Sequence, residues 1–98
     1  MRLAPDEIEA IRGSVRDVFG AAATVRLFGS RVRDELRGGD IDLFVEVERG
    51  QSSIANEQPL RDRIAPVVGD LRVDIILHER DTPLAPLERI ALRDGVLL

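Results

Sequence analysis

The sequence predicts an α/β or α+β fold in which a small mixed β-sheet is flanked by helices. Segments with helical periodicity alternate with strand-like segments along the 98 residues. Two of the strand-like segments, residues 40–48 and 71–77, alternate between an aliphatic row and a row that carries charge, as strands with one buried face do. We therefore expect helices to cover one face of the sheet and carboxylates to lie on the other.

Length and composition limit the possible classes of protein. A chain of 98 residues leaves no room for a second core, so we expect one domain, residues 1–98. Its net charge of −4 argues against broad binding to nucleic acid or to an anionic membrane. There is no cysteine, and no apolar run approaches the ~20 residues of a membrane span. The expected location is the cytoplasm.

The N-terminal segment predicts a helix followed by a short strand. Pro5 and the two acidic residues after it are typical of a first helical turn, and Gly20 ends the segment. Residues 24–28, TVRLF, form a β-type run that ends at Gly29. The apolar face of the helix repeats at helical spacing and consists of Ile8, Ile11, Val15 and Val18.

The next segment predicts a short helix and then a strand with one charged face. Residues 31–36 read as one or two helical turns closed by Gly38-Gly39, which places Gly29-Ser30 between a strand and a helix. In the strand of residues 40–48, side chains alternate between two faces. The aliphatic row is Ile41, Leu43, Val45 and Val47, and the second row is Asp40, Asp42, Phe44, Glu46 and Glu48.

The second half of the chain predicts a helix, a strand and a final helix. The first helix is marked by Leu60, Ile64, Val67 and Val68, and Pro66 should stop or kink it. In the strand, the inner row is Leu71, Val73, Ile75 and Leu77, and the outer row is Arg72, Asp74 and Ile76. The final helix begins at Pro83 and ends at Gly95, with inward-facing residues Leu84, Leu87, Ile90 and Ala91. The single histidine, His78, is expected at the surface.

Three aspartates on these two strands suggest a metal site. Asp40 and Asp42 point the same way and lie ~6.6 Å apart along the strand. If the two strands are neighbours at ~4.8 Å, Asp74 joins them on the outer face. Carboxylates at that spacing can bracket two Mg²⁺ ions, which lie ~3.5 to 4 Å apart in two-metal sites.

Gly29-Ser30 could supply the other half of such a site. Glycine lets the backbone approach a ligand closely, and the amides that follow, together with the Ser30 hydroxyl, can receive phosphate oxygens. Simpler interpretations stay open, because a Gly-Ser pair is often a helix cap and an Asp-x-Asp strand is often a solvated sheet face. Arg31 and Arg33 could contact phosphates, but exposed arginines on a short helix are more often solvated.

The segment FGSRVRDELRGGDIDLFVEV, residues 28–47, taken with the later LRVDIIL, resembles the minimal nucleotidyltransferase family. These proteins are the smallest members of the DNA polymerase β-like nucleotidyltransferase superfamily. The positions that match the family pattern are Gly29, Ser30, Asp40, Asp42 and Asp74. The chain departs from many relatives at Gly39, where they have Ser, and in its C-terminal DGVLL, which lacks a tyrosine that often ends relatives.

The resemblance implies a nucleotidyltransferase fold and a specific chemistry. ATP would be held through Gly29 and Ser30, and two Mg²⁺ ions by Asp40 and Asp42. Asp74 would complete one metal site and help to deprotonate an attacking hydroxyl, so that AMP is transferred and pyrophosphate leaves. Many such proteins are similar to the antitoxin of toxin-antitoxin pairs, which silences a helical HEPN-type ribonuclease toxin by adenylylating a tyrosine. An assembly with such a partner would be expected.

Three hypotheses of function follow. The first is a Mg²⁺-dependent nucleotidyltransferase that adenylylates a partner protein. The second is a non-catalytic antitoxin that neutralises its partner by contact alone. The third, a polymerase-like role on nucleic acid, is disfavoured because an acidic chain without an accessory domain has no evident binding site for a template strand.

Overall fold

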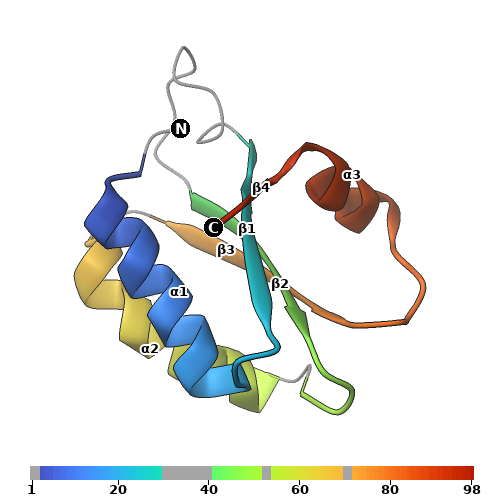
Figure 1. The fold of residues 1–98 in the computed structure, drawn as a ribbon, viewed down its shortest axis with the longest axis horizontal. Coiled ribbons are helices and arrows are strands. Elements are labelled where there is room, and N and C mark those ends of the chain that lie inside the picture. The colour runs from blue at the N-terminus through green and yellow to red at the C-terminus, as the bar shows by residue number, and fades with distance from the viewer. Residues whose placement is uncertain (1–2, 30–40, 52–53, 70–71) are drawn as a thin grey trace.

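A four-stranded mixed sheet with the strand order β3-β2-β1-β4 organises the molecule (Figure 1). The computed structural model describes residues 3–29, 41–51, 54–69 and 72–98. Strands β1 and β2 are antiparallel, β1 and β4 are antiparallel, and β2 and β3 are parallel. The strands are β1 (Thr24–Phe28), β2 (Ile41–Val47), β3 (Val73–Glu79) and β4 (Val96–Leu97).

Two helices cover the first face of the sheet. Helix α1 (Pro5–Phe19) precedes β1, and α2 (Ile54–Val68) forms the crossover that two parallel strands require. Figure 1 shows both helices on the same side of the sheet. They bury the aliphatic row of β2 as predicted, in a core that includes Ile11, Val15, Leu27, Leu43, Val45, Leu60 and Ile64.

The second face is not left open, which corrects the expectation that helices cover one face only. Helix α3 (Pro86–Asp94) packs on it (Figure 1). Phe44, predicted among the carboxylates, is fully buried there with Phe28 and Ala91. An aromatic residue in the polar row therefore marks the place where a helix docks, because its apolar area favours burial.

Helix α3 begins three residues later than predicted, and only part of its predicted inward face meets the sheet: Ala91 is buried as predicted. Ala85 precedes Pro86 and is extended, with φ −71° and ψ 160°, because the residue before a proline disfavours the helical region. Glu88 accepts a hydrogen bond from the Ala85 N–H at 2.7 Å and closes the first turn. Leu87 and Ile90, predicted to face inward, are 55% and 46% exposed.

Other element boundaries differ modestly from the predictions. Helix α2 continues past Pro66 to Val68 and also contains Pro59, so Pro66 does not stop it. Strand β3 extends to Glu79, two residues beyond the predicted end. Strand β4 was not predicted; it pairs with β1 at an edge of the sheet. The helical turns predicted for residues 31–36, and Leu71, lie outside the described residues.

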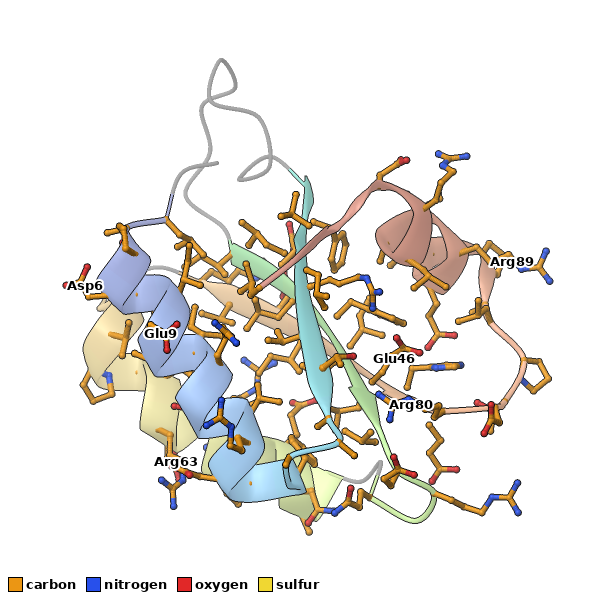
Figure 2. The ribbon with its side chains drawn as sticks, in the orientation of Figure 1. Asp6, Glu9, Glu46, Arg63, Arg80 and Arg89 are labelled. Carbon is orange, nitrogen blue, oxygen red and sulfur yellow. The ribbon has the colours of Figure 1, made fainter. Side chains whose placement is uncertain are left out.

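Charged side chains lie on the outside of the helices, as Arg63 on α2 and Arg89 on α3 illustrate (Figure 2). In the part of the chain that the structure describes, no helix is both long enough and apolar enough to span a membrane.

Candidate active site

Three of the predicted site residues meet at one end of the sheet. Because β1 and β2 are antiparallel, the end of β1 lies beside the beginning of β2, and Phe28 is the register partner of Asp42. Gly29 follows directly after β1. Because β2 and β3 are parallel and in register, Asp42 is also the partner of Asp74. The sheet thus places the two carboxylates side by side, on strands ~4.8 Å apart, with Gly29 next to Asp42.

Gly29 is confined by the carboxylate of Asp42. Its φ of +78° lies in the left-handed region that favours glycine. A Cβ atom at this position would lie 3.3 Å from Asp42 Cγ and would overlap Asp42 Oδ2. The residue must therefore be glycine both for its backbone conformation and for the space that Asp42 occupies.

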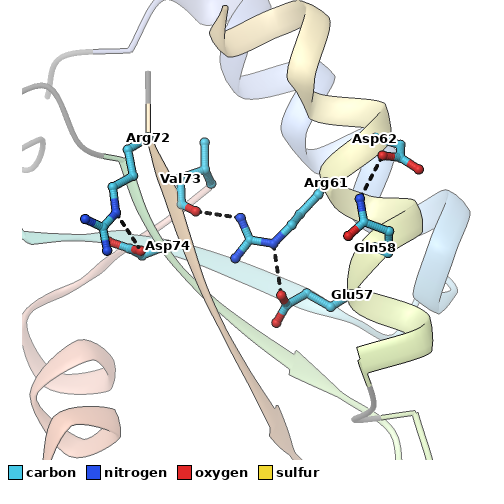
Figure 3. Close-up of polar contacts among 7 residues, drawn as sticks. All are labelled: Glu57, Gln58, Arg61, Asp62, Arg72, Val73 and Asp74. Atoms are coloured by element: carbon cyan, nitrogen blue, oxygen red, sulfur yellow. Dashed lines mark hydrogen bonds and ion pairs between the residues drawn. The ribbon is translucent and has the colours of Figure 1, made fainter. Parts of the chain in front are cut away.

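Asp74 is held by an arginine from its own strand region. Arg72 Nε lies 3.3 Å from Asp74 Oδ1, with the two side chains 74% and 43% exposed (Figure 3). The backbone of Arg72 is fixed, because its carbonyl accepts a hydrogen bond of 2.8 Å from the N–H of Ile41 at the start of β2. Residues two apart on a strand share a face, so the spacing of Arg72 and Asp74 was the available signal for this contact, which the sequence analysis missed.

A second arginine ties α2 to the start of β3. Arg61 Nη1 donates a hydrogen bond of 2.7 Å to the carbonyl of Val73, and Arg61 Nε contacts Glu57 Oε2 at 2.9 Å (Figure 3). Hydrogen bonds from a charged donor are stronger than neutral ones. This contact therefore holds the backbone immediately before Asp74 against α2.

Two of the predicted site residues, Ser30 and Asp40, lie outside the described residues, as do Arg31 and Arg33. Within the described ranges, no group of three histidine, cysteine or acidic side chains is placed to hold a metal ion. The described pair nevertheless fits Mg²⁺, because carboxylate oxygens are its preferred protein ligands. The glycine beside Asp42 also leaves that carboxylate room that a side chain would fill.

His78 is buried, at 6% exposure, and not at the surface as predicted. The extra residues of β3 place it on the second face beside Glu46, its register partner. Its ring stacks on Phe44 with centroids 5.8 Å apart, and Nε2 lies 3.1 Å from the carbonyl of Thr82. The hydroxyl oxygen of Thr82 lies at the same distance, 3.1 Å, from this nitrogen. His78 therefore anchors the segment that leads into α3, and it lies four residues along β3 from Asp74.

A buried residue on the second face separates the candidate site from Glu46 and His78 at the other end of the sheet. Along β2, Asp42 is followed by the buried Phe44 and then by Glu46, which pairs with Arg26 Nη1 at 2.9 Å. Glu46 lies over the sheet in Figure 2. The ion pair neutralises this carboxylate, and the buried Phe44 separates it from Asp42.

Comparison with known proteins bears on this geometry. A family model described as a nucleotidyltransferase domain matches residues 8–97. A solved structure described as a candidate minimal nucleotidyltransferase is 32% identical, with a TM-score of 0.64, and the match covers 99% of this chain and 98% of that one. No curated protein matches the chain. The matched residues include every position of the candidate site.

Proposed function

The chain belongs to the nucleotidyltransferase domain family, and we propose that it transfers AMP from ATP to a hydroxyl, most simply a tyrosine, of a partner protein. The observation that carries the proposal is the in-register pair Asp42 and Asp74 at the end of the sheet beside Gly29. This arrangement gives two carboxylates and a glycine backbone without a side chain in one place, which suits a metal-bound triphosphate.

Each residue has a distinct role in the proposed reaction. The backbone at Gly29 and the Ser30 hydroxyl bind phosphate oxygens of ATP. Asp40, Asp42 and Asp74 would hold two Mg²⁺ ions, which when bound would stabilise the charge that develops on the attacking and leaving oxygens. Of this set, Ser30 and Asp40 are assigned from the sequence alone.

The bond changes follow an in-line displacement. The oxygen of the acceptor hydroxyl forms a bond to the α-phosphorus of ATP, and its proton passes to Asp74. The bond between the α-phosphorus and the oxygen that bridges to the β-phosphorus breaks. Pyrophosphate leaves with that oxygen, and the acceptor keeps AMP as a phosphodiester.

The partner in this proposal is a HEPN-type toxin, which the chain would neutralise as an antitoxin. The acceptor in this proposal is a tyrosine hydroxyl of that partner. The tyrosine cannot be its own, because the chain contains no tyrosine.

Neutralisation by contact alone is the second candidate function. The exposed apolar side chains Leu87 and Ile90 on α3 offer this alternative a surface. The two functions differ in a double variant, Asp40→Asn with Asp42→Asn. Contact alone predicts that this variant still neutralises the partner, whereas transfer of AMP predicts that it binds the partner without neutralising it.

The intact mass of a co-expressed partner toxin tests the proposal directly. Incubation of this chain with the partner, ATP and Mg²⁺ should add the mass of one or more AMP groups to the partner. Chelation of the metal with EDTA should prevent the addition. A partner whose mass stays unchanged under the complete conditions contradicts the proposal.

A further inference from the structure

The contact between Arg72 and Asp74 places a cation on a carboxylate that the proposed function gives to a metal ion. Arg72 Nε lies 3.3 Å from Asp74 Oδ1, and the two residues project from the same face because they are two apart at the start of β3. The guanidinium group therefore already provides the positive charge that a divalent ion would bring to this oxygen.

The geometry of the contact makes it easy to break. Among the described residues it joins a single guanidinium nitrogen to a single oxygen, and the Arg72 side chain is 74% exposed. Arg93 and Asp94, by contrast, form a two-pronged pair at 2.8 and 2.9 Å. Exposed monodentate ion pairs contribute little to stability, because water screens the charges and the long arginine side chain loses conformational freedom.

The backbone of Arg72 stays in place when the side chain moves. Its carbonyl accepts the 2.8 Å hydrogen bond from the Ile41 N–H, which joins the start of β3 to the start of β2. The carbonyl of the next residue, Val73, is fixed by Arg61 at 2.7 Å. Rotation of one exposed side chain is therefore enough to release Asp74, with no change in the strands.

We propose that Arg72 is a displaceable counter-cation of Asp74, which neutralises this carboxylate in the metal-free protein and gives it up when a divalent cation binds. The inference rests on the proposed function, because it takes Asp74 as a metal ligand. Arg72 and the metal ion compete for the same oxygen, so Arg72 lowers the affinity of the metal-free protein for divalent cations and keeps the site balanced in charge until one arrives.

Direct binding of Mn²⁺ without nucleotide, followed by electron paramagnetic resonance of the free ion, tests the inference. Arg72→Gln should bind Mn²⁺ about two- to fivefold more tightly than the wild-type chain, the range expected for an exposed ion pair. Arg72→Lys, which keeps the charge, should lie between the two. In the background of Asp74→Asn, Arg72→Gln should have no effect.

Arg63→Gln is the matched control, because it removes the same charge from another exposed pair, Arg63 and Asp17, also 3.3 Å apart. It should leave the affinity for Mn²⁺ unchanged. Equal effects of Arg63→Gln and Arg72→Gln, or an effect of Arg72→Gln that persists in the Asp74→Asn background, would overturn the inference. If Mn²⁺ binding is weakened by Asp42→Asn but unaffected by Arg72→Gln, only this inference fails. If no binding depends on Asp42, the metal site of the proposed function fails with it.

Discussion

At Gly29 two constraints coincide, a left-handed backbone with φ +78° and a carboxylate where a side chain would begin. Either constraint alone is common in turns. Together they tie the identity of one residue to the orientation of Asp42, and hence to the candidate site. A substitution of Gly29 should therefore have an effect on the site that a substitution of an ordinary turn glycine does not have.

Gly29→Ala should impair both folding and transfer of AMP. A side chain in the left-handed region costs about 1 to 2 kcal/mol, and the new Cβ would push the Asp42 carboxylate away, which should slow transfer about 10²-fold. Urea unfolding and the rate of AMP transfer measure the two effects.

Gly50→Ala is the control for this change. Gly50 has a φ of +88°, but no atom lies within 4 Å of its would-be Cβ, so this variant should lose similar stability and keep its activity. Equal loss of activity in both variants would show that backbone strain, and not the contact with Asp42, explains the effect.

The sequence was sufficient to place Asp42 and Asp74 on one face, because alternation along a strand follows directly from backbone geometry. The spacing of Arg72 and Asp74 also put these two residues in one row, but it did not specify their contact, since the rotamer of an exposed arginine is decided by its three-dimensional surroundings. His78 was misplaced for a related reason: the strand runs two residues further than the alternating pattern, and the chain after it covers the ring.

At the scale of elements, local signals located α1, β1 and β2 to within one residue at each end. Caps, glycines and alternation are properties of short segments. The inward face of the last helix was predicted only in part: Leu84 and Ala91 pack in the cluster on the second face as predicted, whereas the bulky Leu87 and Ile90 are exposed. Apolar bulk in a short helix does not by itself reveal which side faces the core.

Phe44→Ala should destabilise the protein by about 3 to 5 kcal/mol, since it removes a fully buried ring from the contact between α3 and the sheet. Leu87→Ala, on the outer side of the same helix, should change the stability by less than about 0.5 kcal/mol. Urea unfolding of both variants checks this pair. A larger loss of stability in Leu87→Ala than in Phe44→Ala would mean that Leu87 faces the sheet, which contradicts the structure.

Helix α2 carries two prolines in its interior, Pro59 and Pro66, and the one near its C-terminal end should cost stability. Pro66→Ala restores a backbone N–H to the helix, and we expect a gain of roughly 1 to 3 kcal/mol. Interior proline costs about 3 kcal/mol relative to alanine, and the greater freedom of the unfolded chain offsets about 0.4 to 1 kcal/mol.

Pro86→Ala serves as the comparison for this change. Pro86 is the first residue of α3, where the missing N–H has no partner in the helix in any case, so no gain is expected. Thermal or urea unfolding would contradict the account if Pro86→Ala were stabilising and Pro66→Ala were not.

For the molecule as a whole, membership of the nucleotidyltransferase family is confirmed over residues 8–97, whereas the acceptor and the partner stay predictions. The fold class could be predicted because it depends on periodicity. The identity of an acceptor could not, because no residue pattern in this chain specifies it.

The measurement that tests the central claim most directly is the rate at which AMP is added to the co-expressed partner, compared between the wild-type chain and Asp42→Asn. Glu48→Gln is the control, because this residue lies just beyond the other end of β2 and is paired with Arg80 at 2.9 Å. We predict that the wild-type chain and Glu48→Gln add AMP at similar rates, and that Asp42→Asn adds none. Equal addition by Asp42→Asn, or no addition by the wild-type chain, would contradict the account.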